Sequence, residues 1–324
     1  MNVKKSEQLL HLAKAEKEWN ESYYFVFYDK KLNLGGMTRL GFKANKNEGS
    51  AFLILFLPNG SAAMVTSTVA TPDERRKDMR AGGMSHQRLP DGSWRYTFEG
   101  TMVVSKSPEN LPRAKQHPQY IDRLSQVSLD LSFTPFSDTY EYSENMTAES
   151  RELGRKSGDA HWEQIGTAEG HVKLDNETFQ VRNVIGQRDH THGVRDWTGI
   201  GDWLYYVVWF DEDLCINPAA IVAEDGRISS GGFIFEHGEN VPIRSIRVIS
   251  QEFRDNVYPV SSKIEVTDAL NRRHILEGKP RAIVPVPFTD DQGGLSVLTQ
   301  SFGEFVLDGR GGGYGSFETL RKTK

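Results

Sequence analysis

Residues 127–133, VSLDLSF, alternate between apolar and polar side chains. Successive side chains of a β-strand point to opposite faces, so this pattern predicts a strand whose apolar positions, Val127 to Phe133, face a core. The polar positions between them should face water or a polar surface. Two other segments, AFLILFL (51–57) and WLYYVVWF (203–210), carry large apolar groups on both faces, which is typical of strands buried on both sides.

Strand-like segments recur along most of the chain, with no helical pattern alternating between them. Residues that tolerate the positive φ of a tight turn separate many of them. This organisation predicts an all-β, antiparallel sandwich or barrel, preceded by one short amphipathic N-terminal helix around Leu9, Leu12, Ala13 and Trp19. The further strands expected are 22–29, 93–105, 126–136, 231–238, 243–253 and 314–320, and the turn pairs are Asn59-Gly60, Asp91-Gly92, Asp175-Asn176, Asp225-Gly226 and Asp308-Gly309.

The length of 324 residues favours two domains. The segment 144–160, ENMTAESRELGRKSGDA, loses the strand pattern and becomes polar, so it is the expected boundary. We expect an N-terminal domain over residues 1–150 and a C-terminal domain over 151–324. The second half resembles the first in its order of strand patterns, which suggests a duplicated domain.

Charge and composition limit the classes of molecule that this protein is expected to bind. The formal net charge is -5, with no local run of Lys or Arg, which argues against nucleic acid or an anionic membrane as partner. The N-terminus lacks the apolar core of a secretion signal, and no window is long and apolar enough to span a bilayer. Cys215 is the only cysteine, so no intrachain disulfide forms. We expect a cytoplasmic protein, as a monomer or homodimer.

The segment 186–197, GQRDHTHGVRDW, concentrates ionisable groups. Arg188, Asp189, Arg195 and Asp196 form two Arg-Asp units, which could be a structural ion-pair knot that closes one end of a barrel. Alternatively, one carboxyl is poised beside an imidazole as a general acid or base, with an arginine adjusting its pKa. Both interpretations can hold, each for a different pair.

His190 and His192 would share one face of an extended segment, a spacing that zinc sites use. A third ligand, such as His161, His171 or a carboxylate, would have to come from elsewhere, and the neighbouring arginines would repel a cation. The alternative is that each histidine satisfies a buried carboxylate or carbonyl. We therefore expect no metal and no cofactor. GRGGGYG (309–315) lacks the spacing of a phosphate loop, and no G-x-S-x-G nucleophile motif occurs.

The stretch 161–197 resembles a lipocalin-like family that includes carotenoid 1,2-hydratases, AttH-like proteins, kievitone-hydratase-type enzymes and fungal Diels-Alderases. The resemblance rests on an aromatic-Glu-Gln strand followed by Gly-x-Arg-Asp-x-x-x-Gly-x-Arg-Asp; the strand at 129–135 and the terminal 313–318 also fit. His192 departs from the pattern, which more often has an aromatic such as Trp there. The residues that carry the motif are Trp162, Glu163, Gln164, Gly186, Arg188, Asp189, Gly193, Arg195 and Asp196.

The resemblance implies two tandem lipocalin-like β-barrel domains and a cofactor-independent reaction on a hydrophobic unsaturated substrate. The reaction class would be a hydratase-type lyase, or a related isomerase or cyclase, acting on a terpenoid, polyketide or prenylated aromatic. A lipid or isoprenoid carrier without catalysis is the alternative, and a zinc-dependent hydrolase is a third. The expected catalytic residues are Asp189 or Asp196 as proton donor, with His190, His192 and Arg195; the expected substrate-binding residues are Trp162, Glu163, Arg188, Trp197, Trp203 and Tyr205.

Overall fold

The computed structural model describes residues 10–72 and 76–323. The chain forms two compact units, each built from two stretches of sequence. The first unit is Met1–Thr139 with Asp159–Arg195, and the second is Tyr140–Gly158 with Asp196–Lys324. This division differs from the expected one after residue 150, because residues 159–195 return to the first unit. Most of the 186–197 motif therefore lies in the first unit, and the second begins again at Asp196.

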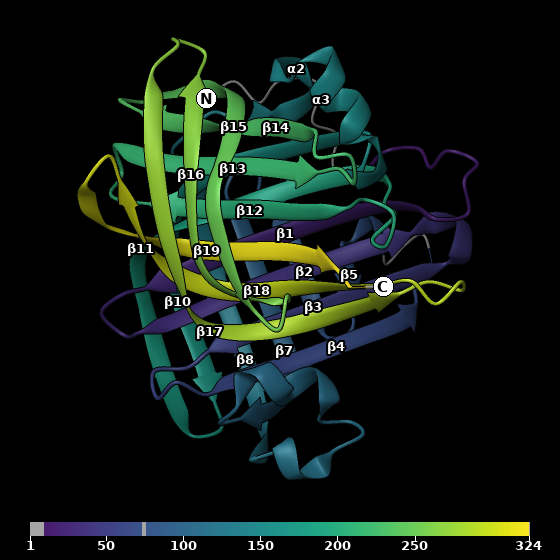
Figure 1. Cartoon of the computed structure of the whole chain (residues 1–324). Helices are drawn as coiled ribbons and strands as arrows, with labels where there is room; N and C mark the ends of the chain where they lie inside the picture. The colour runs from purple at the N-terminus through teal and green to yellow at the C-terminus, as the bar shows by residue number, and fades with distance from the viewer. Residues whose placement is uncertain (1–9, 73–75, 324) are drawn as a thin grey trace. The chain divides into compact units, whose positions relative to one another are not determined.

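Antiparallel strands form the first unit (Figure 1), in the order β4-β3-β2-β1-β11-β10-β8-β7-β6-β5 across the sheet. Three residues of β4 also pair with β7, from Ala62 opposite Ser105 to Met64 opposite Val103. The strands from β4 to β7 in this order therefore form a closed ring. Their bounds are β1 Trp19–Asp29, β2 Leu34–Lys43, β3 Glu48–Phe56, β4 Ala62–Ala70, β5 Arg80–Ala81, β6 Met84–Arg88, β7 Trp94–Ser105, β8 Arg123–Pro135, β10 Ala160–Leu174 and β11 Glu177–Val194, with 3-10 turns at η1 Ala44–Lys46, η2 Pro108–Arg113 and η3 Pro118–Tyr120.

The core of the first unit follows the alternation of the strands. The apolar side chains of 127–133 are at most 3% exposed, while Ser128 and Asp130 between them are partly exposed and Ser132 is exposed. This confirms the predicted inward face of β8. The core also contains a parallel stack of Phe25 on Tyr96, with ring centroids 4.0 Å apart. Both faces of β1 are buried along its whole length.

A closed barrel of eight strands, β12 to β19, forms the second unit. Pairing of β12 with β19, from Trp203 opposite Leu320 to Trp209 opposite Tyr314, closes it. The all-β class expected from the sequence is confirmed. The strands are β12 Asp202–Trp209, β13 Leu214–Val222, β14 Ile228–Glu236, β15 Glu239–Arg254, β16 Tyr258–Asp268, β17 Arg273–Thr289, β18 Leu295–Leu307 and β19 Arg310–Lys322.

Residues 140–158, expected to be a domain boundary, hold the short β9 (Tyr140–Glu141) and the helices α2 (Tyr142–Asn145) and α3 (Ala148–Leu153), with η4 (Arg155–Ser157). Thr147 caps α3, because its hydroxyl accepts from Ser150 N at 3.1 Å. The helix packs on β14, where the Ser229 hydroxyl donates to Ser150 O at 2.7 Å. Among the described residues, no helix has the length and apolar content needed to cross a membrane.

The expected turn pairs each contain a residue with positive φ, as tight turns require. Asp308 (φ 51°) and Gly309 (φ 83°) both do so, in the two-residue hairpin between β18 and β19. The expected N-terminal helix does not agree with the structure where its residues are described. Leu9 lies outside the described residues, and residues 10–18 contain no helix. The reason is that Asn45 Nδ2 donates to the carbonyls of Lys14 (2.7 Å) and Glu16 (2.8 Å), which are thus satisfied without a helix.

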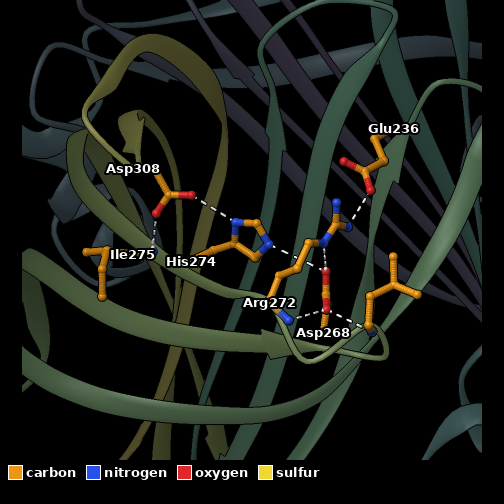
Figure 2. A network of polar contacts seen from close by, with 7 residues as sticks. Glu236, Asp268, Arg272, His274, Ile275 and Asp308 are labelled. Atoms are coloured by element: carbon orange, nitrogen blue, oxygen red, sulfur yellow. Dashed lines mark hydrogen bonds and ion pairs between the residues drawn. The ribbon is translucent and has the colours of Figure 1, made fainter.

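A polar network braces the second unit (Figure 2) at the turn between β16 and β17. Asp268 accepts hydrogen bonds from Leu270 N and Arg272 N, both at 2.9 Å, and from Arg272 Nε at 2.6 Å. Arg272 also pairs with Glu236 of β14. His274 extends the network, since its Nδ1 lies 2.8 Å from Asp308. The network thus ties three segments of the barrel together.

Candidate functional site: two polar clusters on opposite faces of one strand

The strand β11 carries the motif residues from Gly186 to Val194 and lies between β1 and β10. Because side chains alternate along a strand, Arg188, His190 and His192 face the core side, and Asp189 and Thr191 face the opposite side. Gly193, the second-last residue of β11, lies at a close approach: a Cβ there would lie 2.3 Å from the backbone nitrogen of Asp159. Its φ of +122° also favours glycine.

The first cluster, the Asp189 cluster, consists of His161, Glu163 and Asp189. Glu163 is directly opposite Asp189 in the pairing of β10 with β11, and His161 is opposite Thr191. One ligand atom from each of the three residues of the cluster lies within 4.8 Å of the others. The sheet register therefore brings two carboxyl groups and an imidazole together.

His161 and Glu163 are held in place within the Asp189 cluster. Nε2 of His161 lies 2.8 Å from Oε1 of Glu163, and its Nδ1 lies 2.6 Å from the Thr191 hydroxyl. Gln187 Nε2 donates to the other oxygen of Glu163 at 2.7 Å. Glu163 is fully buried, and its two oxygens are satisfied by His161 of the same strand and by Gln187 of β11.

Asp189 differs from its neighbours because it makes no hydrogen bond within the part of the chain that the structure describes. Its burial raises its pKa to about 6; the nearby Glu163 also raises it, whereas His161, Arg195 and Arg39 oppose the shift. The side chain is only partly buried by its neighbours. It is thus a carboxyl that can hold a proton near neutral pH and has no fixed hydrogen-bond partner on the described chain.

The second cluster, the His190 cluster, consists of His11, Glu21, His190 and His192 on the core side of the same strands. Glu21 and His190 are fully buried. Oε1 of Glu21 lies 2.7 Å from Nδ1 of His11 and 3.0 Å from Nε2 of His190. The backbone nitrogen of His11 also donates to both carboxylate oxygens at 3.1 Å. Glu21, and not an aspartate of the motif, is thus the carboxylate partner of the motif residue His190.

Aromatic rings surround the His190 cluster. Tyr23 stacks on His190 with centroids 4.5 Å apart and an interplanar angle of 16°. Trp162 lies 5.1 Å from His190 and 5.4 Å from His192, and Trp19 lies 6.1 Å from His192. These contacts fix the imidazole rings in a largely apolar surrounding.

The local environment shifts the pKa values of two members of the His190 cluster, Glu21 and His192. Burial opposes ionisation of Glu21, but hydrogen bonds from His11 and His190 outweigh it, so the pKa of Glu21 is lowered. Burial, helped by the nearby His11, lowers the pKa of His192 to about 4. The cluster at neutral pH therefore contains an ionised carboxylate and a neutral His192.

Neither Arg-Asp unit of the motif forms an ion pair within itself among the described residues. Arg188 faces the core side, where its Nε and Nη2 donate to Gln164 Oε1 at 2.9 and 2.7 Å and its guanidinium lies 4.9 Å from the Trp94 ring. Asp196 instead accepts from Gly199 N at 2.9 Å and lies 3.4 Å from Lys156 Nζ. Arg188 and Asp189 do not pair with each other because adjacent residues of a strand face opposite sides.

The remaining expected site residues belong to the second unit. Trp197 stacks on Phe288, with centroids 4.2 Å apart, and lies 5.4 Å from Trp203. Tyr205 is on β12, opposite Ala219. The structure thus brings Trp162, His190 and His192 together on one face and Glu163 with Asp189 on the other, and it assigns Asp196, Trp197, Trp203 and Tyr205 to a different unit.

Sequence reasoning missed Glu21 and His11. Glu21 had a detectable signal, because it interrupts the apolar alternation of Trp19, Tyr23 and Phe25 on the inward face of β1. A carboxylate at such a position needs a buried partner. His11 lies in an irregular segment without periodicity, so no pattern could have placed it beside Glu21.

Solved structures similar to this chain share its fold. A Nitrosomonas europaea protein provisionally assigned as AttH is 13% identical, with a TM-score of 0.65 and 100% of both chains covered. Kievitone hydratase from Nectria haematococca is 9% identical, with a TM-score of 0.54 over 94% of this chain and 89% of that chain. CghA is 10% identical, with a TM-score of 0.53 over 94% of this chain and 87% of that chain.

These neighbours belong to the groups that the 161–197 motif resembles, so the resemblance is confirmed at the level of fold. No curated protein sequence matches the chain. A family model does match, over residues 4–323, and it is described as a domain of unknown function, DUF7064. Since the match spans nearly the whole sequence, the chain belongs to the DUF7064 family.

Proposed function

We propose that this protein is an acid–base lyase of the hydratase type, or a related isomerase or cyclase, acting on a hydrophobic unsaturated substrate without a redox cofactor. The observation that carries the proposal is the Asp189 carboxyl, without a hydrogen-bond partner on the described chain, beside the bonded His161–Glu163 pair. The similarity in fold to a structure named kievitone hydratase supports the reaction class.

The Asp189 cluster holds the groups that such a reaction needs. Adding water to a double bond requires an acid that protonates one carbon and a base that takes a proton from the attacking water. In the proposed mechanism Asp189 donates the first proton, and its raised pKa leaves a fraction of the carboxyl groups protonated near neutral pH. The Asp189 carboxylate that remains then takes the proton from the attacking water, which restores the acid. His161, whose ring nitrogens bind Thr191 and Glu163, is a positioning residue in this mechanism.

Two arginines adjust the charge of the Asp189 cluster. Arg39 and Arg195 both act electrostatically on Asp189 and favour its ionised form. After proton transfer they would stabilise the carboxylate that remains, which lowers the cost of the charge-separated state. The proposed role of Arg195 is thus the electrostatic one expected from the sequence, exerted on Asp189 and not on its neighbour Asp196.

The first test is Asp189→Asn, which preserves size and removes the transferable proton. Terpenoid polyenes, prenylated aromatics and unsaturated polyketides are incubated with the purified protein, and products are followed by mass spectrometry for gain or loss of one water or for isomerisation. We expect turnover to fall by about 10²- to 10⁴-fold, with an unchanged thermal unfolding temperature. Asp130→Asn is the matched control, because Asp130 pairs with Arg95 on β8 and β7 and is not near the cluster.

Two results would contradict this assignment. Full turnover in Asp189→Asn, combined with loss in Asp196→Asn, would move the proton donor to Asp196. Lipid bound at one equivalent in native mass spectrometry, with no conversion of any substrate by the wild type, would instead support a carrier.

A further inference from the structure

We propose that the His190 cluster is a binding site for one divalent transition-metal ion of the Zn²⁺ class, with His11, Glu21 and His190 as ligands and a water molecule in the fourth position. This inference departs from the expectation of no metal and is independent of the proposed reaction. The site lies on the core side of β11, whereas the Asp189 cluster lies on the opposite side.

The positions of the donor atoms support the proposal. Nδ1 of His11, one carboxylate oxygen of Glu21 and one ring nitrogen of His190 lie within 4.8 Å of one another. Nδ1 of His11 and Nε2 of His190 both approach Oε1 of Glu21, at 2.7 and 3.0 Å. Donor atoms that bind one Zn²⁺ at about 2.0–2.2 Å lie roughly 3 Å or slightly more apart. Small side-chain shifts would therefore open these contacts to admit an ion.

The chemistry of the donors fits a borderline transition metal. Imidazole nitrogens with one carboxylate are ligands that Zn²⁺ and related ions accept, whereas Ca²⁺ and Mg²⁺ prefer oxygen. Glu21 is fully buried, and no lysine or arginine among the described residues contacts it. A divalent ion would place positive charge beside this buried carboxylate, whose hydrogen bonds come from His11 and His190.

His192 gives a second, independent observation. Its Nδ1 is buried and has no hydrogen-bond partner within residues 10–72 and 76–323. Its ring centroid lies 4.0 Å from that of His11. A buried polar atom without a partner is uncommon, and a bound water or ion is the usual explanation. A water bound to the metal beside His11 would give this atom a partner.

The Asp189 cluster offers a similar set of residue types but is a poorer metal site. Both ring nitrogens of His161 are already engaged, by Glu163 and Thr191. Arg39 and Arg195 act electrostatically on Asp189 and would repel a cation. In the described part of the chain, no lysine or arginine plays that role at Glu21, so the observations favour the His190 cluster.

A metal at this position would have a structural consequence. His11 comes from the irregular segment 10–18, whereas Glu21 and His190 lie on β1 and β11. The ion would fasten this segment to the two strands, in addition to the Lys14–Asp159 ion pair at 2.7 Å. Metal removal should therefore loosen residues 10–18 while the strands stay paired.

The test uses the full-length protein stripped with a chelator and titrated with Zn²⁺ by calorimetry and with Co²⁺ by visible absorption. We expect one ion per chain, ligand-field bands typical of four-coordinate Co²⁺, and a higher unfolding temperature with metal. Glu21→Gln and His11→Ala should each weaken binding at least about tenfold. His117→Ala, at an exposed histidine, should bind like the wild type.

His11→Ala is the safer variant for folding, since His11 lies outside every strand. Absence of binding by the wild type would overturn the proposal and leave Glu21 satisfied by hydrogen bonds alone. Stoichiometric binding that survives in both variants would overturn it as well, because the ion would then sit elsewhere. Neither result depends on turnover, so the acid–base proposal is judged separately.

Discussion

His86 shows how burial alone sets the protonation state of a side chain in this protein. It is fully buried in the first unit, with Nε2 3.0 Å from the Thr38 hydroxyl and its ring edge-on to Tyr96 at 4.8 Å. Its Nδ1 is also buried and has no hydrogen-bond partner in the described chain. Burial lowers the pKa of His86 to about 3, so the folded protein holds the ring neutral.

This neutral histidine predicts a pH dependence of stability. Below the ordinary pKa of 6.5 the unfolded chain binds a proton at His86 that the folded chain does not. The contribution to stability is therefore complete above pH 6.5 and is lost as the pH falls toward 3, by up to about 1.4 kcal/mol for each pH unit. Urea unfolding of wild type and His86→Gln between these values should show a flatter profile in the variant.

An exposed histidine provides the control for this prediction. His237→Gln, at the turn between β14 and β15, should keep the wild-type slope. Equal slopes for wild type and His86→Gln would show that His86 is protonated in the folded state and would refute the prediction.

Residue types in the motif were easier to identify than their partners. The sequence marks Asp189, His190 and His192 as unusual, and alternation correctly places the two histidines on one face. It cannot supply their partners. Glu21 is on β1 and His161 is on β10, and both come close to the motif because these strands pair with β11. Partners from other strands depend on register, which is a tertiary property.

At the scale of elements, turns and strands were largely predictable. Period-two alternation and positive-φ residue pairs are local signals, and the expected strands and hairpins agree with the structure. The N-terminal helix was wrong over residues 10–18, because side chains from elsewhere in the unit bind this segment's backbone. Local propensity is overridden wherever such long-range hydrogen bonds are available.

The β16–β17 turn gives a prediction about an element (Figure 2). Asp268→Ala removes the acceptor for two backbone N–H groups and for Arg272. We expect the free energy of unfolding of the second unit to fall by about 1–3 kcal/mol, since three donors at the turn lose their acceptor. Thermal or urea unfolding measures the change. Asp291→Ala, at an exposed position, should change it little, and an equal effect of both would argue against a bracing role for the network.

At the scale of the whole molecule, the two units are interleaved along the chain. The first unit is complete only when residues 159–195 return to pair β10 with β8 and β11 with β1. The polar segment 144–160 was the expected boundary, yet it connects two strands that belong to the same unit. Composition marks a change in local structure, but it does not reveal to which unit the following strands return.

This interleaving predicts how fragments behave. A fragment of residues 1–150 lacks β10 and β11, which leaves β1 and β8 each without one of its two partners and the ring open. We expect it to show no cooperative unfolding and to aggregate through its unpaired edges. A fragment of residues 1–195 should have dispersed amide NMR signals and a cooperative transition. Cooperative unfolding of the shorter fragment would show that the first unit does not need the returning strands.

The sequence by itself determined the all-β class, most strands and turns, the family resemblance and the chemically unusual stretch 186–197. These follow from local alternation, turn chemistry and motif spacing, which depend on neighbours along the chain. Only the tertiary structure decided that Asp189 meets Glu163 and His161 while His190 meets Glu21 and His11. The physical reason is that sheet register sets the partners across strands, and a strand directs adjacent residues to opposite faces.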